Sequence, residues 1–275
     1  MKCGYVAILG RPNAGKSSLI NRIVGEQVAI VTRRRQTTRN NILGVFNDKD
    51  AQIIFIDTPG VHHSKNKLDK FMMKNVRSAI GTADVVVYLI DASTLVDEEE
   101  LDYIKMLKSK VKNVLVVLNK VDKKLLAQID ADMKISAKEG VNIDVLLKKI
   151  EELLPIGEPI FSADEFTDRS VNFLVCEFIR GILLEKIDNE IPHGVAVVVD
   201  ACAENEKNVV MDISIIVENE RHKGFVIGKG GALVKELGVR AREYAEELFG
   251  KPVVMHIFVK VDENWRDRNI SSYGY

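Results

Sequence analysis

The stretch from Gly10 to Ser17, Gly-Arg-Pro-Asn-Ala-Gly-Lys-Ser, restricts the fold of this chain more than any other part of the sequence. It follows an apolar run, Tyr5–Leu9, and precedes a helical pattern that begins near Ser18. Gly-x-x-x-x-Gly-Lys-Ser between a strand and a helix is a phosphate-binding loop, because its glycines let the backbone wrap closely around phosphates. The N–H groups at the start of the helix then point at negative charge. The sequence therefore predicts a site for a nucleoside triphosphate.

Several groups of this loop have predicted roles. Lys16 can reach the outer phosphates, and the Ser17 hydroxyl can hold Mg²⁺. The amide oxygen of Asn13 can help to hold a monovalent cation such as K⁺ beside the phosphates, where its charge would act as an arginine finger does elsewhere. The other predicted nucleotide contacts of the loop are Ala14, Gly15 and Ser18.

Apolar runs alternate with amphipathic segments from Gly4 to about Leu154. The apolar runs are Tyr5–Leu9, Ile53–Ile56, Val85–Ile90 and Val114–Leu118, and the amphipathic segments lie around Ser18–Val24, Lys67–Ile80, Glu98–Leu107 and Ile143–Leu154. The runs are nearly continuous and β-branched, which is typical of strands buried on both faces. This alternation predicts an α/β domain with a doubly wound, mostly parallel sheet. Residues 41–47 are expected to pair with residues 51–57 as a hairpin.

A second domain is predicted after a proline- and glycine-containing stretch. We expect a nucleotide domain at residues 1–155, a linker at 156–170 and a smaller α+β domain at 171–275. The elements expected in the second domain are a helix at Val171–Asp188, strands at Val195–Val199 and Val209–Val217, a helix at Ala232–Phe249 and a last strand at Val253–Val261.

The composition places limits on the class of protein. The chain has 275 residues, 46% of them apolar, and a net charge of −1, so no overall basic field attracts it to nucleic acid or lipid. The three cysteines are scattered without metal-ligand spacing and are expected to be reduced. The first strand begins too early to leave room for a signal peptide, and no apolar run is long enough to span a bilayer. We therefore expect a cytoplasmic protein without a transmembrane segment.

The sequence Asp57-Thr-Pro-Gly60 closes the second buried strand after the phosphate loop. Asp57 can reach Mg²⁺ through water, and the N–H of Gly60 can contact the terminal phosphate. Between the loop and this strand lies the basic stretch Thr32–Arg39, in which one threonine of the Thr37-Thr38 pair is expected to close on Mg²⁺ when the terminal phosphate is present. The alternative is a plain exposed loop.

A guanine site is predicted at Asn119-Lys120-Val121-Asp122, directly after the strand Val114–Leu118. A carboxylate at Asp122 accepts hydrogen bonds from N1–H and the exocyclic amine of guanine, and adenine would leave that charge unpaired. Asn119 can fix the loop and contact the purine, and the stem of Lys120 can cover the ring. Ser136, Ala137 and Lys138 are expected to present a backbone N–H to the guanine oxygen.

Slow hydrolysis is predicted from Val61. In Ras-like GTPases a glutamine follows Asp-x-x-Gly and orients the attacking water, and a valine cannot do this. We expect acceleration by a partner or a cation. The predicted catalytic groups are Lys16, Thr38 and Gly60.

The second predicted domain contains Gly228-Lys-Gly-Gly231 between two helical segments. This is the loop with which KH modules clamp a single-stranded backbone, although a helix C-cap followed by a new helix is the alternative. Residues 221–242 carry six basic residues and one acidic residue, within a domain that is acidic as a whole. The predicted RNA contacts are Arg221, Lys223, Ile227, Gly228, Lys229, Gly230, Gly231, Lys235, Arg240 and Arg242.

Together these residues resemble the Era family of bacterial GTPases over essentially the whole chain. The resemblance rests on Gly10–Ser17, Gln36–Arg39, Asp57–Gly60, Asn119–Asp122, Ser136–Ala137, Thr167–Arg169, Val226–Gly231, Trp265–Arg266 and Gly274–Tyr275. It implies a type II KH domain that binds the 3′ end of 16S rRNA, a role in maturation of the small ribosomal subunit, and Thr38 as the switch threonine. It also implies a monomer that binds GTP or GDP with Mg²⁺, and in some members a peripheral association with the inner membrane. The stretch between Asp122 and Ser136 is shorter than is usual in the family, so the helix expected there is truncated.

Two other readings stay open. A P-loop kinase would transfer phosphate to a small acceptor, but Asn119–Asp122 and the lack of an evident arginine-bearing lid argue against it. Alternatively, the KH-like domain of a GTPase would bind protein, in which case partner binding would be insensitive to salt.

Overall fold

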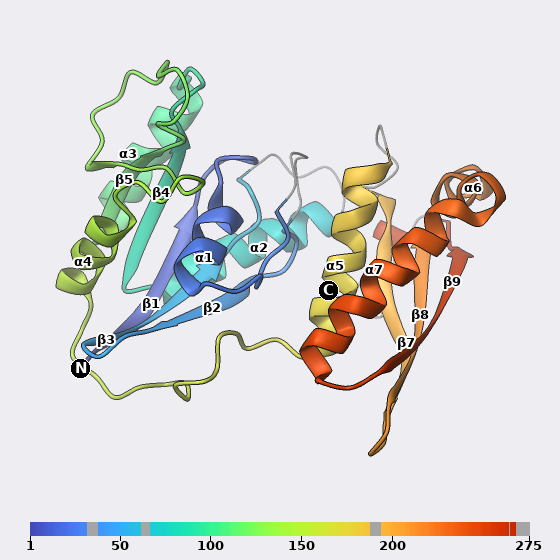
Figure 1. Ribbon diagram of the computed structural model, residues 1–275. Coiled ribbons are helices and arrows are strands. Elements are labelled where there is room, and N and C mark those ends of the chain that lie inside the picture. Colours follow the sequence, from blue (N-terminus) through green and yellow to red (C-terminus); the bar gives the residue numbers. More distant parts are fainter. Residues whose placement is uncertain (32–37, 62–66, 188–193, 264, 268–275) are drawn as a thin grey trace. The chain divides into compact units, whose positions relative to one another are not determined.

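The computed structural model describes residues 1–31, 38–61, 67–187, 194–263 and 265–267. The chain forms two compact units, and the division along the chain falls between Asp168 and Arg169. The predicted switch residues 32–37 and the tail residues Gly274–Tyr275 lie outside the described residues. The helices and strands of the first unit (Figure 1) are β1 (Lys2–Leu9), α1 (Lys16–Val24), β2 (Ile42–Asn47), β3 (Ala51–Asp57), α2 (Lys67–Thr82), β4 (Val85–Asp91), α3 (Glu98–Lys110), β5 (Val114–Asn119), β6 (Met133–Lys134) and α4 (Ile143–Leu153). Those of the second unit are α5 (Val171–Lys186), β7 (Ala196–Glu204), β8 (Val209–Val217), α6 (Glu220–Ile227), α7 (Ala232–Phe249) and β9 (Val253–Val261).

The first unit contains the predicted doubly wound sheet, with strand order β2-β3-β1-β4-β5-β6. The expected hairpin is confirmed, because β2 runs antiparallel to β3 while the other neighbouring strands are parallel. Figure 1 shows α1 and α4 on one face of this sheet and α2 and α3 on the other. Since parallel strands end at the same edge, the loops that follow β1, β3, β4 and β5 meet there.

The stretch between β5 and β6 contains no helix, in line with the short spacing in the sequence: residues 121–132 form turns, bends and chain without regular secondary structure. The backbone N–H groups of Leu126 and Ala127 donate to the carbonyl of Ala92, at 2.8 and 3.1 Å. The Asp132 carboxylate accepts from the N–H of Val116, at 2.8 Å. Ile129 packs against the core between the sheet and α3. A segment without regular secondary structure thus covers this part of the core, where a truncated helix was expected.

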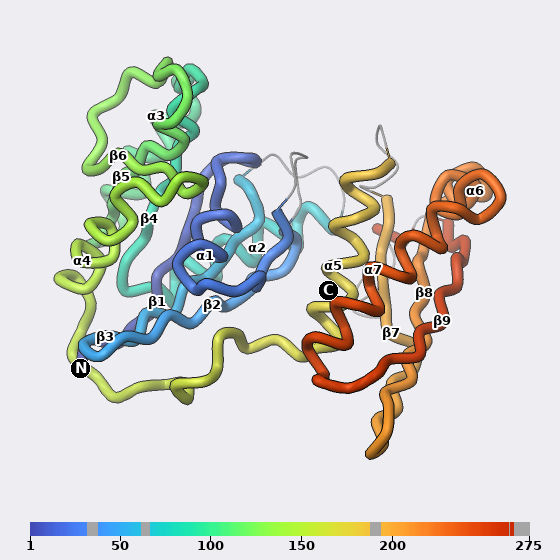
Figure 2. The backbone as a smooth tube through the Cα atoms, viewed as in Figure 1, coloured from blue at the N-terminus to red at the C-terminus, as the bar shows by residue number. Residues whose placement is uncertain are grey.

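The segment after α4, whose course Figure 2 shows, makes backbone hydrogen bonds to the first unit at Met1, Cys3 and Val45. The buried side chain of Gln52 accepts from the N–H groups of Ile160 and Phe161, at 2.6 and 3.0 Å, and donates to the carbonyl of Phe161, at 2.8 Å. The N–H of Val45 donates to the carbonyl of Phe166, at 2.9 Å. The N–H of Leu43 likewise donates to the Asp168 carboxylate, at 3.2 Å, so two backbone groups at the outer edge of β2 have partners in this segment.

The second unit has a three-stranded sheet of order β7-β8-β9, in which β7 and β8 are antiparallel and β8 and β9 are parallel. Helices α5 and α7 cover one face of the sheet (Figure 1), and their apolar side chains form one core with the strands. Trp265 is fully buried, and its indole N–H donates to the carbonyl of Gly194, at 2.9 Å. The part of the tail at Trp265 is therefore a structural anchor of the unit.

Within the ranges described above, no helix combines the length and the apolar character that a bilayer crossing requires.

Candidate nucleotide site and glycine-loop surface

The phosphate loop has the backbone shape that its sequence predicts. Gly10 and Gly15 have φ values of 143° and 98°, which favour glycine, and α1 starts directly after Gly15. A Cβ atom at Gly15 would come within 2.3 Å of the Asn119 side-chain nitrogen, so this position has no room for a side chain. Asn13 also has a positive φ, 66°, within the loop. The loop therefore wraps around the start of α1, where N–H groups favour an anion.

Lys16 is buried at the base of this loop. Its ammonium donates to the carbonyl oxygens of Gly10 and Arg11, at 3.2 and 3.1 Å. Burial lowers the pKa of Lys16 to about 8, and the attraction of Asp57 opposes that shift. A triphosphate in the loop would give this buried cation the negative partner that it needs.

The three predicted magnesium ligands lie in mutual contact. The Ser17 hydroxyl donates to Oδ2 of Asp57, at 2.7 Å, and the Thr38 hydroxyl lies 3.0 Å from the same oxygen. The hydroxyl oxygens of Ser17 and Thr38 are 3.1 Å apart. Three residues from α1, the segment before β2 and the end of β3 thus converge on one point.

The second carboxylate oxygen of Asp57 indicates what that point can hold. Asp57 is fully buried, and its Oδ1 has no hydrogen-bond partner among the described residues. Burial also raises the pKa of Asp57, against the effects of Lys16 and the two hydroxyls. Buried oxygen ligands with an unsatisfied carboxylate are suited to a hard divalent cation such as Mg²⁺, so the residues fit the predicted metal.

Gly60 and Val61 lie against the phosphate loop. A Cβ atom at Gly60 would come within 2.8 Å of Pro12, and the N–H of Val61 donates to the carbonyl of Gly10, at 3.2 Å. The side chain of Val61 packs against the apolar core between the sheet and α2 and α3. An apolar side chain held there has no group that could bind a water molecule.

Asn119 joins the phosphate loop to the predicted base-binding loops. Its amide donates to the carbonyl of Ala14, at 2.8 Å, and accepts from the N–H of Ala137, at 2.9 Å. The Lys120 ammonium donates to the carbonyl of Asn13, at 2.5 Å, and to the Asp91 carboxylate, at 2.6 Å. The N–H of Ala137, one of the candidate donors to the guanine oxygen, is therefore engaged by Asn119 in this conformation.

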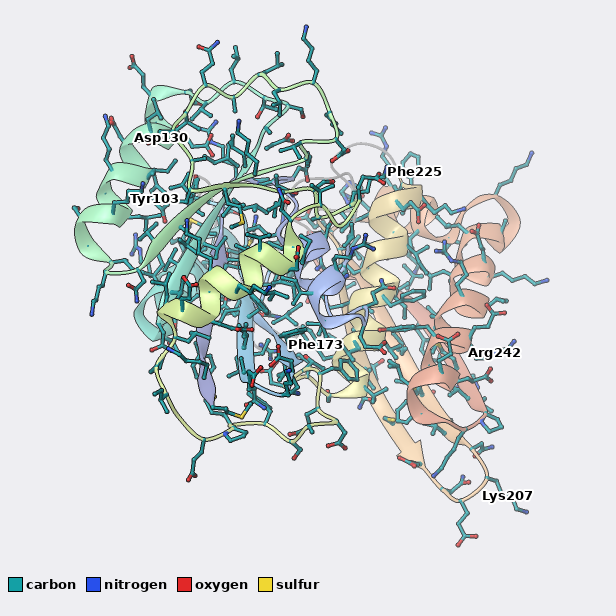
Figure 3. All side chains as sticks on the ribbon, turned by 60° about the vertical axis from the view of Figure 1, so that its left-hand side comes forward. Tyr103, Asp130, Phe173, Lys207, Phe225 and Arg242 are labelled. Atoms are coloured by element: carbon teal, nitrogen blue, oxygen red, sulfur yellow. The ribbon has the colours of Figure 1, made fainter. Side chains whose placement is uncertain are left out.

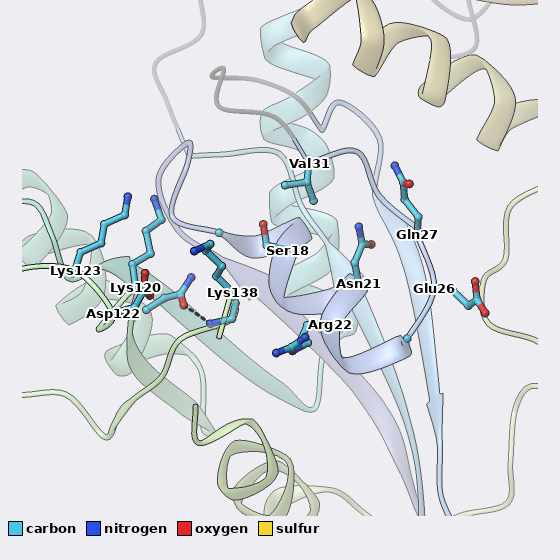
Figure 4. Close-up of a pocket in the computed structure, with 14 residues that line it drawn as sticks. Ser18, Asn21, Arg22, Glu26, Gln27, Val31, Lys120, Asp122, Lys123 and Lys138 are labelled. Atoms are coloured by element: carbon cyan, nitrogen blue, oxygen red, sulfur yellow. Dashed lines mark hydrogen bonds between the residues drawn. The ribbon is translucent and has the colours of Figure 1, made fainter. Parts of the chain in front are cut away.

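A pocket of about 790 Å³ opens beside these residues. Figure 4 shows Lys120, Asp122 and Lys138 along one side, with Ser18 on α1 near its centre. The Asp122 carboxylate is exposed and accepts a hydrogen bond from the Ser136 hydroxyl, at 2.6 Å, which holds the pKa of Asp122 below its usual value. Asp122 is thus ionised and oriented, with accepting capacity left for a base in the pocket.

Sequence reasoning missed three residues that support this site. Arg11 ties the phosphate loop to the start of α3 through Asp97, at 2.6 Å, and Asp91 orients Lys120. Asn21 bonds the backbone of Val28 and Ala29, at 2.7 to 3.1 Å, in the segment that leads to the pocket wall. Only Asp91 carried a signal, since it ends a buried strand at the edge where the motifs meet.

The glycine loop of the second unit depends on backbone conformation. Gly228, Gly230 and Gly231 have φ values of 74°, 61° and 78°, all in the region that favours glycine. A Cβ atom at Gly228 would come within 2.9 Å of Leu233. Helix α6 ends at Ile227 and α7 begins at Ala232, so the loop is a tight connection between two helices with Lys229 exposed at its tip.

The basic residues near the loop differ in their partners. Arg240 lies 3.8 and 3.9 Å from Glu185 and Glu236, and Arg242 lies 3.9 Å from Glu246. Arg221, Lys229 and Lys235 are exposed, Lys223 and Ile227 are half-buried, and Gly230 is exposed at the tip. Glu185 on α5 is distant in sequence from Arg240 but lies beside it. The unpaired positive charge near the loop is therefore smaller than the sequence count over residues 221–242 had indicated.

Family models match both units. The model described as a 50S ribosome-binding GTPase matches residues 5–120, and a KH domain model matches residues 190–266. The chain is 39% identical over 291 residues to the GTPase Era of Alkaliphilus metalliredigens, and the alignment covers 100% of this chain and 99% of the relative. The GTPase Era of Leuconostoc citreum is 42% identical over 292 residues, with 100% and 96% coverage.

Two solved structures have the same fold over the full chain. A crystal structure of Era in complex with MgGDPNP and nucleotides 1506–1542 of 16S ribosomal RNA matches with a TM-score of 0.94 at 36% identity, covering 100% of this chain and 99% of that one. An Era variant from Aquifex aeolicus bound to GDP and AlF4⁻ matches with a TM-score of 0.92 at 35% identity and the same coverage. The chain is about 40% identical to these relatives over its full length, and it contains the phosphate loop, Asn119–Asp122 and the glycine loop of a KH domain. It therefore belongs to the Era family of GTPases.

Proposed function

We propose that this chain is a molecular switch that hydrolyses GTP to GDP and phosphate, binds the 3′ end of 16S rRNA through its KH domain, and assists maturation of the small ribosomal subunit. The observation that carries the proposal is the convergence of Ser17, Thr38 and Asp57 next to a pocket that holds Asp122. The relative solved with MgGDPNP and 16S RNA supports both ligand classes. The kinase alternative lacks a comparable supporting observation.

In this proposal the nucleotide lies across the edge of the sheet. Its phosphates are held by Lys16 and the amides of Ala14, Gly15 and Ser18, and its guanine by Asn119, Lys120 and Asp122, with Ser136, Ala137 and Lys138 closing the pocket. The arrangement is supported by the pocket, whose lining includes Gly15, Ser18, Asn119, Lys120, Asp122, Ala137 and Lys138. Selectivity for guanine follows because adenine lacks the pair of N–H donors that guanine presents to the Asp122 carboxylate.

Mg²⁺, when bound, would neutralise charge on the outer phosphates. Ser17, Thr38 and Asp57 would hold it, directly or through water. Lys16 stabilises charge on the terminal phosphate, and the N–H of Gly60 orients it. Val61 gives the attacking water no partner, so hydrolysis without a stimulating factor is slow.

Asn13 is the proposed ligand for K⁺ beside the phosphates. Its position in the phosphate loop supports this role, and the added charge would stabilise the transition state. Turnover of the full chain in KCl is expected to exceed turnover in NaCl, and Asn13→Ala is expected to remove the difference. Equal rates in the two salts would contradict the role of Asn13 and leave GTP hydrolysis intact.

The KH domain is proposed to clamp single-stranded RNA at Gly228–Gly231, with Arg221, Lys223, Ile227, Lys229, Lys235, Arg240 and Arg242 as the surrounding contacts. The left-handed glycines support close approach of an RNA backbone. Crosslinking of the chain to total ribosomal RNA with GTP, GDP and no nucleotide tests the proposal. We expect crosslinks at the 3′ end of 16S rRNA; crosslinks elsewhere, or crosslinking to protein alone, would contradict it.

We also propose that residues 1–155 act as the GTP-binding domain, 156–170 as the linker and 171–275 as the KH domain. The contacts of Gln52 with residues 160 and 161 support a linker that is held by the first unit for most of its length. The protein is proposed to act in the cytoplasm as a monomer, with peripheral association at the inner membrane. Fractionation of cells, with and without a salt wash of the membranes, tests the localisation.

A further inference from the structure

An aromatic side chain near the end of α6, Phe225, is partly exposed to solvent. Phe225 is 47% exposed, while its neighbour Val226 is fully buried in the core of the second unit. Gly228, which opens the glycine loop, follows Phe225 by three residues, a rise of about 4.5 Å along a helix. A half-exposed aromatic ring thus lies one helical turn before the loop. Figure 3 labels Phe225 together with Arg242.

One basic side chain accompanies this ring. Arg221 precedes Phe225 by one helical turn, and its guanidinium carbon lies 5.9 Å from the centre of the ring. Arg221 itself is exposed and makes no ion pair with a carboxylate among the described residues, in contrast to Arg240 and Arg242. A guanidinium at this distance is attracted to the ring, and its positive charge is available to a phosphate beside the ring.

We propose that Phe225 is a stacking platform for one unpaired RNA base, next to the backbone clamped at Gly228–Gly231, and that Arg221 holds the adjacent phosphate. The proposal rests on the RNA-binding function proposed above and adds a contact that net charge and the glycine motif do not indicate.

The physical reason is the division of tasks between backbone and base. The glycine loop brings a sugar-phosphate backbone close to the end of α6, but by itself it holds phosphates and not bases. Every base has a flat face, and stacking on an aromatic ring removes that face and the exposed ring from water together. Phe225 is half-exposed and lies beside the loop. A base attached to the clamped phosphates can therefore stack on its ring.

A second phenylalanine of the same unit provides a matched control. Phe258 on β9 is 49% exposed, but it lies in the sheet between two residues whose side chains contact carboxylates. His256 is 2.8 Å from the Asp212 carboxylate, and Lys260 is 3.0 Å from that of Asp200. The two rings are equally exposed, and only Phe225 adjoins a loop that can hold a phosphate backbone.

The test measures affinity of the full chain, with a non-hydrolysable GTP analogue, for a fluorescent single-stranded RNA of the 16S 3′-end sequence. Stacking on an aromatic side chain contributes enough that Phe225→Ala is expected to weaken binding by about 5- to 100-fold. Phe225→Leu, which keeps an apolar side chain without the ring, is expected to lose most of that affinity, and Phe225→Tyr to retain it. Phe258→Ala is expected to bind like the unaltered chain.

Two further measurements separate stacking from other effects. The slope of log affinity against log salt is expected to stay unchanged in Phe225→Ala, because no phosphate contact is lost. An RNA series with one base removed at each position should contain one abasic RNA that binds Phe225→Ala and the unaltered chain equally. That position would identify the stacked base.

Three results would overturn the platform. They are equal RNA affinities of Phe225→Ala and the unaltered chain, equal losses in Phe225→Ala and Phe258→Ala, and full affinity in Phe225→Leu. GTP affinity and the melting temperature, measured on every variant, distinguish these results from misfolding. If the unaltered chain bound a protein partner and no RNA, the RNA-binding proposal itself would fail, and the platform with it.

Discussion

The nucleotide site and the glycine loop are prepared for their ligands in opposite ways. In the first unit most of the functional side chains are held by hydrogen bonds to neighbouring protein groups. Asp57, Lys16 and Asn119 are each less than 7% exposed, and the exposed Asp122 is held by Ser136. In the second unit Lys229 and Phe225 are exposed, and what is fixed is the backbone of the glycines. Side chains that are already oriented before binding favour selectivity for one small ligand. A fixed backbone can bind the sugar-phosphate chain of any RNA, and the choice among bases then depends on the side chains around it.

The largest predicted effect tests selectivity in the prepared site. Asp122→Asn removes the charged acceptor for guanine and is expected to weaken GTP binding by about a hundredfold or more, since hydrogen bonds to a charged group contribute about 1.5–3 kcal/mol each. Binding of xanthosine triphosphate should improve, because the new amide can donate to the xanthine oxygen. Titration calorimetry with both nucleotides measures the change.

Asp130→Asn is the control for this change, since Asp130 is an exposed carboxylate of the same unit that does not line the pocket (Figure 3). It should bind GTP normally. Equal GTP affinities of the Asp122 variant and the unaltered chain would contradict the role of Asp122.

The next effect concerns the loop with the fixed backbone. Lys229→Asp combined with Gly230→Asp reverses the charge at the tip of the loop, and Asp is one of the few residues besides glycine that adopts a φ of 61°. RNA affinity is expected to fall below detection in a gel-shift assay while GTP affinity stays normal. Loss of both activities would instead indicate misfolding, and normal RNA binding would exclude the loop as the clamp.

A stability comparison tests the contrast between buried and exposed sites. Asn119→Ala leaves the carbonyl of Ala14 and the N–H of Ala137 without their partner, and we expect a loss of about 2–4 kcal/mol in the free energy of unfolding of the first unit. Lys229→Ala should change the stability by no more than about 0.5 kcal/mol. Urea denaturation of the two variants measures both values. Similar losses of unfolding free energy in Asn119→Ala and Lys229→Ala would contradict the contrast between a buried nucleotide site and an exposed glycine loop.

The smallest effect is a pH dependence of GTP binding. The free chain loses the Lys16 proton as the pH rises through about 8, whereas the triphosphate requires the charged ammonium. Affinity is therefore full below pH 8 and falls above it, by up to about tenfold per pH unit. Calorimetry at pH 8.5 in two buffers of different ionisation enthalpy should detect proton uptake on binding. No uptake between pH 8 and 9 would contradict the lowered pKa.

The sequence predicted well those parts of the molecule that local pattern determines. The strands of the first sheet, the KH fold and the loops at Gly10–Ser17 and Asn119–Asp122 follow from periodicity and short motifs, and the structure contains them at the expected places. The sheet then brings Ser17, Thr38 and Asp57 together, as the order of motifs had indicated.

Other features depend on partners far away in the chain, and no local pattern reveals them. Gln52 looks like an ordinary polar residue in a strand until residues 160 and 161 bond to it. Arg240 counts toward a basic cluster in sequence, but Glu185 from another helix lies beside it. Side-chain pairing of this kind arises only when the helices pack, so the counted charge overstated the free charge near the glycine loop.

The proposal of a molecular switch requires that the nucleotide bound in the first unit changes the RNA affinity of the second. The most direct test is the affinity of the full chain for the 16S 3′-end RNA with a GTP analogue, with GDP and without nucleotide, repeated for Asp122→Asn with xanthine nucleotides. The account predicts that RNA affinity differs between the triphosphate and diphosphate states, and that the variant shows the same difference only with xanthine nucleotides. Identical RNA affinities in all three states of the unaltered chain would contradict it.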